Sequence, residues 1–281
     1  MQNANTWLIT GVSTGFGREM AEQLLAAGKT VVGTVREGSR AKVAELEAAY
    51  PDTLDCQLLD VRDVPAVHET VDAAWECHGR IDVVVSNAGY GLFGCAEELS
   101  DTEIDRIVAT NLVGSIQLIR SALPHLRAQG GGRIVQLSSY GGQVAYAANS
   151  MYHATKFGIE GFCESVAQEV AQFGIGVTIV EPGGARTEFR YGSARVAQLM
   201  PEYESCHGFL RMLDPANGLA PGDPARMARR IVESVELEPA PLRIVLGSHA
   251  LNETLRVTRE RLAAFEGMTE LAASTDFPAG E

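Results

Sequence analysis

The chain has 281 residues, of which 46% are hydrophobic and 21% are charged, and its formal net charge is −13. This composition excludes an intrinsically disordered chain, and the length suits a single α/β domain with a sizeable core. The negative charge argues against a nucleic-acid partner, because a protein that neutralises phosphates needs a basic face.

The cysteines and the first residues indicate a cytoplasmic protein. The five cysteines are scattered, odd in number and without C-x-x-C spacing, which favours reduced thiols over disulfides or a zinc site. Residues 1–6 are polar and lack the basic segment that opens a signal peptide. Because no stretch of about eighteen apolar residues occurs, we expect no membrane span and no membrane partner. No group of residues has metal-ligand spacing, so we expect metal-free chemistry.

Short runs of apolar, β-branched residues alternate with longer amphipathic segments. Strands are expected at residues 7–10, 30–35, 53–59, 81–86, 133–137, 177–180 and 242–246. Helices are expected at residues 16–27, 40–50, 64–77, 101–128, 151–173 and 224–235. The apolar runs predict strands buried on both faces, as in a parallel sheet. The alternation predicts an α/β fold: a Rossmann-like, doubly wound parallel sheet of about seven strands with helices on both faces.

Two later segments depart from this rhythm. Residues 188–221 mix apolar residues with Gly, Pro and charge, which predicts a substrate loop or lid. Residues 248–281 are expected to form a final amphipathic helix and a loose tail, with apolar positions at Leu251, Leu255, Leu262 and Phe265. We interpret this helix as a cover for the sheet in preference to a membrane-surface helix. Residues 1–281 would then form one dinucleotide-binding domain.

A glycine-rich turn follows the first expected strand. It reads Thr10-Gly11-Val12-Ser13-Thr14-Gly15-Phe16-Gly17. Glycines let the backbone turn tightly beside a pyrophosphate, and the helix N-terminus that follows offers N–H groups to the anion. Three glycines in seven residues also occur in ordinary turns, but the position between a strand and a helix favours a nucleotide site.

The end of the second strand bears on the choice of cofactor. A site for NAD usually places an acidic residue there to bind the ribose 2′-hydroxyl, whereas an arginine suits the 2′-phosphate of NADP. Here Val35 occupies the position of the acid and Arg36 follows it. A solvated loop arginine is the alternative. We predict NADP(H) as the cofactor, in preference to NAD(H).

Tyr152 and Lys156 stand four residues apart, and Ser139 precedes the tyrosine by thirteen. On a helix, side chains at this spacing share one face, with Cβ atoms roughly 5–6 Å apart. A nearby ammonium should lower the pKa of the phenol below its ordinary value of about 10, so that it can exchange a proton near neutral pH. Alone, the pair could be a half-buried tyrosine with a solvated lysine. Together with Ser139 and the glycine turn, it is typical of a carbonyl reductase or alcohol dehydrogenase.

From Thr6 to about Gly247, the chain resembles the short-chain dehydrogenase/reductase family. The motifs that carry the resemblance follow in family order: Thr10-Gly11-x-x-x-Gly15-x-Gly17, Asp60-Val61, Asn87-Ala88-Gly89, Asn111, Ser139, Tyr152-x-x-x-Lys156 and Pro182-Gly183 with Thr187. Each motif is weak alone, but their order and spacing are specific. Within the family, the chain is most similar to carbonyl reductases grouped near the hydroxysteroid and retinol dehydrogenases, on the segments Asn87-Ala88-Gly89-Tyr90-Gly91, Thr34-Val35-Arg36 and Glu181-Pro182-Gly183.

The resemblance implies a role for each matching residue. Tyr152 would be the general acid or base, Lys156 would lower its pKa and bind the nicotinamide ribose, and Ser139 would orient the substrate oxygen. Asn111 would help to hold a proton-carrying water chain, although a structural bond to a neighbouring backbone is an equal alternative. His153, one residue from the tyrosine, is interpreted as a spacer.

The remaining matches are expected to bind the dinucleotide. Asp60 and Val61 would lie near the adenine, although Asp60 could equally cap a strand end. Asn87, Ala88 and Gly89 would lie beside the adenosine ribose. The nicotinamide carboxamide would meet Pro182, Gly183, Ala185 and Thr187. Within the glycine turn, the expected cofactor residues are Gly11, Ser13, Thr14, Gly15, Phe16 and Gly17, joined by Tyr152 and Lys156 at the other end of the site.

The substrate is expected to be an apolar small-molecule carbonyl compound or alcohol, bound in an apolar pocket. Its candidate lining is Tyr90, Phe93, Val144, Tyr146, Phe189, Tyr203, Phe209 and Met212, although such side chains also simply pack. The resemblance implies a homodimer or homotetramer formed through the helices at 101–128 and 151–173. Alternatives are an NAD-dependent alcohol dehydrogenase and a non-catalytic NADP(H) sensor. Nucleotide-sugar chemistry generally needs a longer chain.

Overall fold

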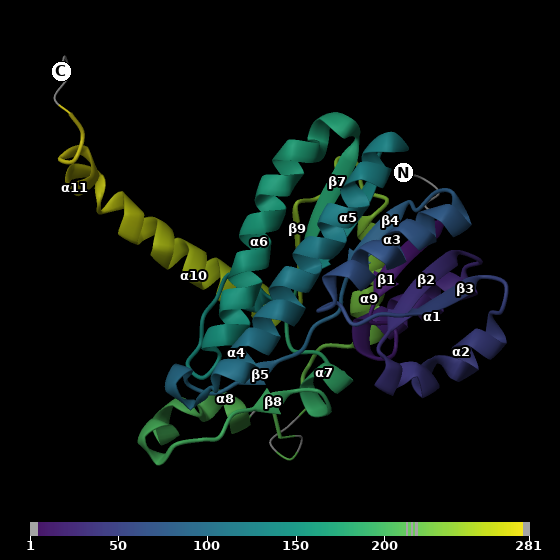
Figure 1. Ribbon diagram of the computed structural model, residues 1–281. Helices are drawn as coiled ribbons and strands as arrows, with labels where there is room; N and C mark the ends of the chain where they lie inside the picture. Colours follow the sequence, from purple (N-terminus) through teal and green to yellow (C-terminus); the bar gives the residue numbers. More distant parts are fainter. Residues whose placement is uncertain (1–4, 212, 215, 217–218, 278–281) are drawn as a thin grey trace.

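A parallel β-sheet forms the centre of the computed structural model, which describes residues 5–211, 213–214, 216 and 219–277. In this part of the chain, seven strands pair in the order β3-β2-β1-β4-β6-β7-β9 (Figure 1). Their bounds are Thr6–Thr10 (β1), Thr30–Val35 (β2), Leu54–Leu58 (β3), Val83–Ser86 (β4), Gly132–Leu137 (β6), Ile175–Pro182 (β7) and Arg243–Leu246 (β9). All neighbouring strands are parallel, which confirms the predicted doubly wound sheet.

The strand order reverses beside β1. The chain builds outward through β2 and β3 and then returns to place β4 on the other side of β1. Ligands of open α/β sheets bind at the carboxyl ends of the strands near such a reversal. The loops that follow β1 and β4 therefore face each other across the expected binding crevice.

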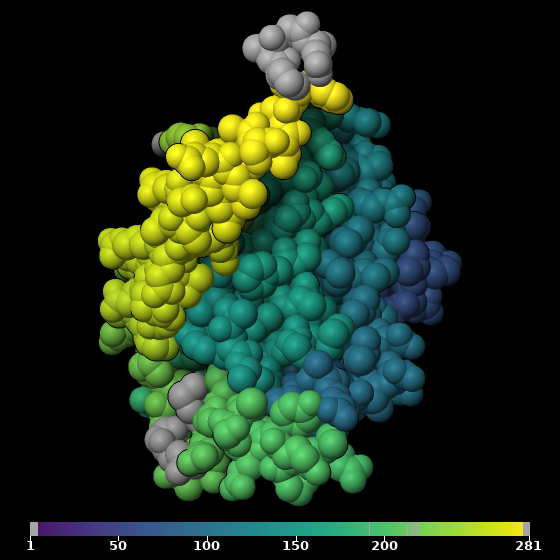
Figure 2. Space-filling view, turned by 90° about the vertical axis from the view of Figure 1, so that its left-hand side faces the viewer, coloured from purple at the N-terminus to yellow at the C-terminus, as the bar shows by residue number. Residues whose placement is uncertain are grey.

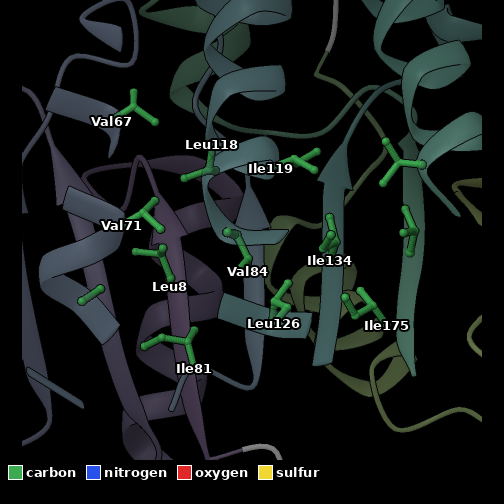
Figure 3. Packing of buried hydrophobic residues seen from close by; sticks show 14 of the residues in the cluster. Leu8, Val67, Val71, Ile81, Val84, Leu118, Ile119, Leu126, Ile134 and Ile175 are labelled. Carbon is green, nitrogen blue, oxygen red and sulfur yellow. The ribbon is translucent and has the colours of Figure 1, made fainter. Parts of the chain in front are cut away.

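Helices cover both faces of the sheet, because successive strand residues point to opposite sides. Leu8 packs in the core beneath α3 (Val64–His78), α5 (Gly114–Ala128) and α6 (Ser150–Val170). Ile9 packs in the opposite core with α1 (Gly15–Ala26) and α9 (Pro224–Ser234). Figure 3 shows the first core, with side chains from strands and helices at Leu8, Val71, Val84, Leu118, Ile119 and Ile134.

Two of the expected helices are interrupted. The segment expected as a helix at 101–128 forms α4 (Asp101–Ile107), a π-helical stretch (Val108–Val113) and then α5. The segment expected at 40–50 begins with the 3₁₀ turn Glu37–Val43 and continues as α2 (Ala44–Ala49). Hydrophobic periodicity does not separate these helix types over one turn, and π-helical stretches often lie at functional sites.

The segment after β7 forms a lid over the carboxyl end of the sheet. Within it, β8 (Arg195–Val196) pairs in parallel with β5 (Leu92–Phe93), which follows β4. Its other elements are α7 (Glu188–Tyr191), the 3₁₀ turn Pro201–Cys206 and α8 (Gly208–Arg211). Elsewhere in the described residues, further 3₁₀ turns lie at Ala96–Glu98, Tyr140–Gly142 and Ala171–Phe173. We call residues 188–221 the lid.

The C-terminal helices project away from the sheet (Figure 1). They are α10 (Ser248–Glu266) and α11 (Thr269–Ala273). Within α10, all of which is described, only Ala250 is buried, and Phe265 is 61% exposed. The expectation that this helix covers the sheet is therefore wrong, because an amphipathic pattern shows that one face is apolar but not which surface it meets. Among the described residues, no helix is long and apolar enough to cross a membrane.

Candidate active site

A cavity of about 1310 Å³ opens at the carboxyl ends of the strands. It brings together residues that the sequence places more than 170 positions apart, from the glycine turn to the start of the lid. The predicted site residues that line it are Gly11, Ser13, Thr14, Gly15, Phe16, Arg36, Asp60, Val61, Asn87, Ala88, Gly89, Ser139, Tyr152, Lys156, Pro182, Gly183, Ala185 and Thr187. Gly17 and Asn111 are the predicted residues that do not line it.

The glycine turn needs backbone conformations and a close backbone contact that residues with a side chain do not allow. Gly11 and Gly15 have φ angles of +77° and +61°, which side chains rarely adopt. A Cβ on Gly17 would lie 2.2 Å from the Gly11 carbonyl oxygen, so Gly17 allows the close approach of helix and turn. Thr14, the N-cap of α1, makes no side-chain capping bond, which leaves N–H groups of the first turn available to an anion.

Asn87 fastens this turn to β4. Its Nδ2 donates to the carbonyl oxygens of Thr10 (2.8 Å) and Gly11 (3.1 Å). In return, the Thr10 hydroxyl accepts from the backbone N–H groups of Asn87 (3.0 Å) and Ala88 (3.1 Å). The asparagine therefore fixes the shape of the crevice in addition to lining it.

The end of the crevice near β2 and β3 is basic. Arg36, Lys42 and Arg62 line it. Arg62 pairs with Asp60 at 2.5 Å, and its hydrogen bonds lower the pKa of that carboxyl. Asp60 also accepts a hydrogen bond from the Arg62 backbone N–H (3.1 Å). This bond agrees in part with the alternative that Asp60 caps the end of a strand. The sequence analysis did not identify Arg62, although a basic residue two positions after Asp60 could have indicated an ion pair with it.

Ser139, Tyr152 and Lys156 meet at the other end. Tyr152 and Lys156 lie on one face of α6, with the lysine Nζ 5.8 Å from the centre of the phenol ring. All three are buried. The lysine Nζ donates to the Leu137 carbonyl oxygen (2.8 Å), and the Ser139 hydroxyl accepts from the Gly141 backbone N–H (3.0 Å). The three side chains therefore converge as predicted from the sequence.

Burial sets the protonation of this group. It raises the pKa of Tyr152 to about 12, an effect that a hydrogen bond with Ser139 opposes. It lowers the pKa of Lys156 to about 8, against the favourable charge of Glu160. The expectation of a lowered phenol pKa is thus wrong for this structure, because desolvation outweighs the hydrogen bond with Ser139 and the Lys156 ammonium is bonded to the Leu137 carbonyl oxygen. Tyr152 consequently carries its proton at neutral pH.

Ser138 and Ser139 point to different partners. The Ser138 hydroxyl donates to Glu160 Oε1 (2.5 Å), whereas Ser139 faces Tyr152. Successive residues after a strand diverge in this way, which agrees with the prediction of Ser139 as the site residue.

A buried acidic pair lies behind Lys156, and the sequence interpretation did not identify it. Glu160 and Glu181 are almost completely buried, and Arg243 Nε lies 2.9 Å from Glu181 Oε1. Burial and the adjacent Glu160 charge raise the pKa of Glu181 to about 7. The pair depends on a residue of β9 that is distant in sequence, so spacing could not reveal it.

Asn111 lies in the π-helical stretch and is buried. Its Nδ2 donates to the Tyr90 carbonyl oxygen (2.8 Å), and its Oδ1 accepts from the Tyr90 backbone N–H (3.0 Å). The Asn111 side chain therefore makes the structural bonds to a neighbouring backbone that were the alternative to a role in a water chain. A part in proton transfer stays a prediction.

His153 is more than a spacer. It is buried and lines the cavity, and its Nδ1 lies 3.3 Å from the Tyr146 backbone N–H, which donates to it. Burial lowers the pKa of His153 to about 4, so the ring stays neutral and able to accept this bond. It thereby holds the loop that carries Tyr146.

Aromatic rings surround Tyr152. The ring centres of Phe93 and Phe189 lie 5.9 and 5.8 Å from that of Tyr152. Phe209 of the lid lies 5.3 Å from Phe93. Of the expected apolar lining, the cavity includes Tyr90, Phe93, Tyr146, Phe189 and Phe209 but not Val144 or Tyr203, and Met212 lies outside the described residues. His249 and Leu213 also line it and were missed.

Comparisons with known proteins agree with this geometry. Residues 5–195 match the family model described as short chain dehydrogenase. The chain is 32% identical to oxidoreductase BOA17 of Botryotinia fuckeliana over 96% of this chain and 98% of that protein. It is 36% identical to human retinol dehydrogenase 8 over 75% and 70%, respectively.

Solved structures extend the similarity to three dimensions. A short-chain dehydrogenase from Streptomyces avermitilis has a TM-score of 0.91 and 38% identity, covering 98% of this chain and 100% of that one. ElxO with bound NADP has a TM-score of 0.73 and 26% identity, covering 89% and 100%. The chain belongs to the short-chain dehydrogenase family of oxidoreductases.

Proposed function

We propose that the protein is an NADP(H)-dependent oxidoreductase that transfers hydride between the nicotinamide and a ketone, an aldehyde or a secondary alcohol. One observation carries the proposal: Ser139, Tyr152 and Lys156 converge in the same cavity whose other end is formed by the glycine turn. A dinucleotide needs both ends of this cavity, because its phosphates would lie at the glycine turn and its nicotinamide ring, which is distant from them, would lie beside Tyr152.

The residues present suit such a cofactor. A Cβ at Gly17 would clash with the turn, and the first turn of α1 offers N–H groups to a pyrophosphate. Arg36, Lys42 and Arg62 supply positive charge at the adenosine end, where a 2′-phosphate would lie. The NADP bound by the similar protein ElxO supports the choice of NADP(H) over NAD(H).

The proton chemistry follows from the protonation of Tyr152. The cofactor supplies the hydride to the carbonyl carbon. With its raised pKa, Tyr152 holds a proton that it can give to the carbonyl oxygen as negative charge develops there. The Ser139 hydroxyl donates a second hydrogen bond to that oxygen, and Lys156 is the cation placed to stabilise the phenolate that remains. In the oxidative direction, the same groups act in reverse.

The substrate end favours an apolar carbonyl compound. Phe93, Phe189 and Phe209 form its walls around Tyr152. Similarity to retinol dehydrogenase 8 supports a hydrophobic substrate. The five cysteines, all described, are free thiols, which supports a cytoplasmic location.

The test is to follow absorbance of NADPH with a panel of apolar ketones, aldehydes and quinones. In Tyr152→Phe, which removes the hydroxyl alone, we expect kcat to fall by about 10²–10⁴ while the Kd for NADPH stays near that of the wild type. Normal turnover in this variant would contradict the role of Tyr152. Tight NADPH binding without turnover of any compound would favour the alternative of a non-catalytic sensor.

A further inference from the structure

A second cluster of reactive side chains lies outside the cavity, where the lid meets the body. Cys95 precedes the 3₁₀ turn that follows β5, and Glu98 is the last residue of that turn. Cys206 ends the lid's own 3₁₀ turn, and His207 follows it. A ligand atom from each of Cys95, Glu98 and His207 lies within 4.8 Å of the other two. The Cys206 thiol interacts with the Cys95 thiol but does not lie within 4.8 Å of all three of those atoms, so it would have to move closer to join them. Figure 2 shows the green lid beside the blue segment that carries β5.

The cluster is enclosed and ordered by hydrogen bonds. The Glu98 side chain is fully buried, and that of His207 is 13% exposed. Glu98 Oε1 lies 2.8 Å from His207 Nε2 and accepts from the Met200 backbone N–H (2.7 Å). Glu98 Oε2 accepts from the Cys95 backbone N–H (2.6 Å). The carboxylate is therefore fixed between two segments separated by more than a hundred residues.

We propose that Cys95, Glu98, Cys206 and His207 bind one divalent transition-metal ion, with Zn²⁺ as the best match. Thiolates, imidazoles and carboxylates all bind zinc, and four such protein ligands would form a closed, tetrahedral site. Sequence reasoning predicted no metal site, because the ligands come from two distant pairs and no ligand spacing is visible.

Binding of Zn²⁺ involves no oxidation or reduction. Binding breaks the two thiol S–H bonds, releases two protons to solvent and forms two Zn–S bonds, together with bonds to neutral His207 and ionised Glu98. Ligand atoms at Zn–N and Zn–O distances of about 2.1 Å are roughly 3.4 Å apart in a tetrahedron, so the present contact of 2.8 Å must widen by about 0.6 Å. Glu98 can keep its bond from Met200, since a carboxylate oxygen has two lone pairs.

The position of the cluster gives the ion a structural role. Phe93, two residues before Cys95, contacts Tyr152, and Phe209, two residues after His207, contacts both Phe93 and Tyr146. An ion that joins Cys95 to His207 would therefore fix the two walls of the apolar pocket relative to each other. Its binding and its effect on thermal stability can be measured without a substrate.

The chain offers a matched control. Ligand atoms of Asp55, Cys77 and His78 also lie within 4.8 Å of one another, but Cys77 is exposed. This second group is more open to water than the first. It should bind Zn²⁺ weakly, so variants at Cys77 and His78 report on non-specific binding.

The experiment uses the full chain, stripped by a chelator under reducing conditions and titrated with Zn²⁺ or Co²⁺ alone. We expect one tightly bound ion per chain, release of about two protons, a thiolate-to-Co²⁺ charge-transfer band and a higher Tm. Cys206→Ala and His207→Ala, both at partly exposed positions, should each weaken affinity about tenfold or more. Cys77→Ala and His78→Ala should leave it unchanged.

Three results would overturn the proposal. They are the absence of tight binding by the wild type, binding that survives the Cys206→Ala/His207→Ala double variant, and binding lost in the Cys77→Ala/His78→Ala double variant. A Cys95–Cys206 disulfide in the untreated protein, combined with no zinc affinity after reduction, would instead assign the two thiols to redox chemistry.

Discussion

Lys156 combines a buried ammonium with a bond to a backbone carbonyl. Its lowered pKa of about 8 means that the unbound protein loses this charge within an accessible pH range. Because the charge stabilises the phenolate left by Tyr152, its loss should slow the reduction. The rate of carbonyl reduction should therefore depend on pH.

We expect kcat/KM for carbonyl reduction to fall as the pH rises above about 8, when the ammonium of Lys156 deprotonates. Below that pH the lysine is charged and Tyr152 protonated, so the profile should be flat down to the range in which other groups titrate. Lys156→Arg keeps the charge at any accessible pH and should move the decline upward. An unchanged profile in this variant would exclude the lysine as its source.

Arg36 provides a second prediction at this scale. Arg36→Ala should raise the Kd for NADPH by about tenfold or more while changing that for NADH little, because only NADPH carries the 2′-phosphate. Arg226→Ala, which alters a side chain that is 85% exposed on α9, is the control for a change in charge alone. If NADH is preferred and Arg36→Ala does not alter that preference, the cofactor assignment is wrong.

The sequence predicted the convergence of Ser139, Tyr152 and Lys156, because their spacing on one strand end and one helix is local. It did not predict their electrostatics. The pKa of Tyr152 depends on how far the surrounding structure excludes water, and that of Lys156 also depends on Glu160. Burial is a property of the assembled fold and cannot be counted from residue spacing.

At the scale of elements, strands were predictable and helix interruptions were not. β4 begins with three valines and β6 has Ile134 and Val135 at its centre, and all residues of both strands are buried, so their apolar residues carry a clear signal. The π-helical stretch around Asn111 carries no comparable signal, since it differs from α4 and α5 by hydrogen-bond pattern and not by residue type.

Packing within these elements gives a stability prediction. Leu118 on α5 is 1% exposed in the core between helices and sheet, whereas Leu262 on α10 is 56% exposed. Leu118→Ala should lower the free energy of unfolding by about 2–5 kcal/mol, because it removes buried contacts and leaves a cavity. Leu262→Ala should change it by about 0.5 kcal/mol or less. Urea unfolding measures both, and similar losses in the two variants would mean that α10 is buried in solution.

At the scale of the whole molecule, self-association stays a prediction. Exposed apolar side chains lie on α6, at Phe157, and on the projecting α10, at Leu255 and Phe265. We expect a homodimer or homotetramer formed through α4, α5 and α6. Light scattering should therefore give a multiple of the subunit mass of 30.1 kDa.

Two variants distinguish the surfaces that could form this assembly. Phe157→Glu should shift the mass toward that of one subunit, because it places a charge on α6 at the expected interface. Phe265→Glu should have no effect if α10 stays outside the interface. A single-subunit mass for the unaltered protein would contradict the expectation altogether.

The path of α10 joins the interior to the periphery. Its first turn, with Ser248, His249 and Ala250, forms part of the cavity wall, and the same helix then continues to Glu266 in solvent. At a rise of 1.5 Å per residue it is a rod about 28 Å long. A tilt of a few degrees at the first turn of α10 displaces its C-terminal end, at Glu266, several times farther than it displaces the cavity wall. A fluorescent dye on that tip would act as a pointer, magnifying small adjustments around the bound molecules into a readable displacement.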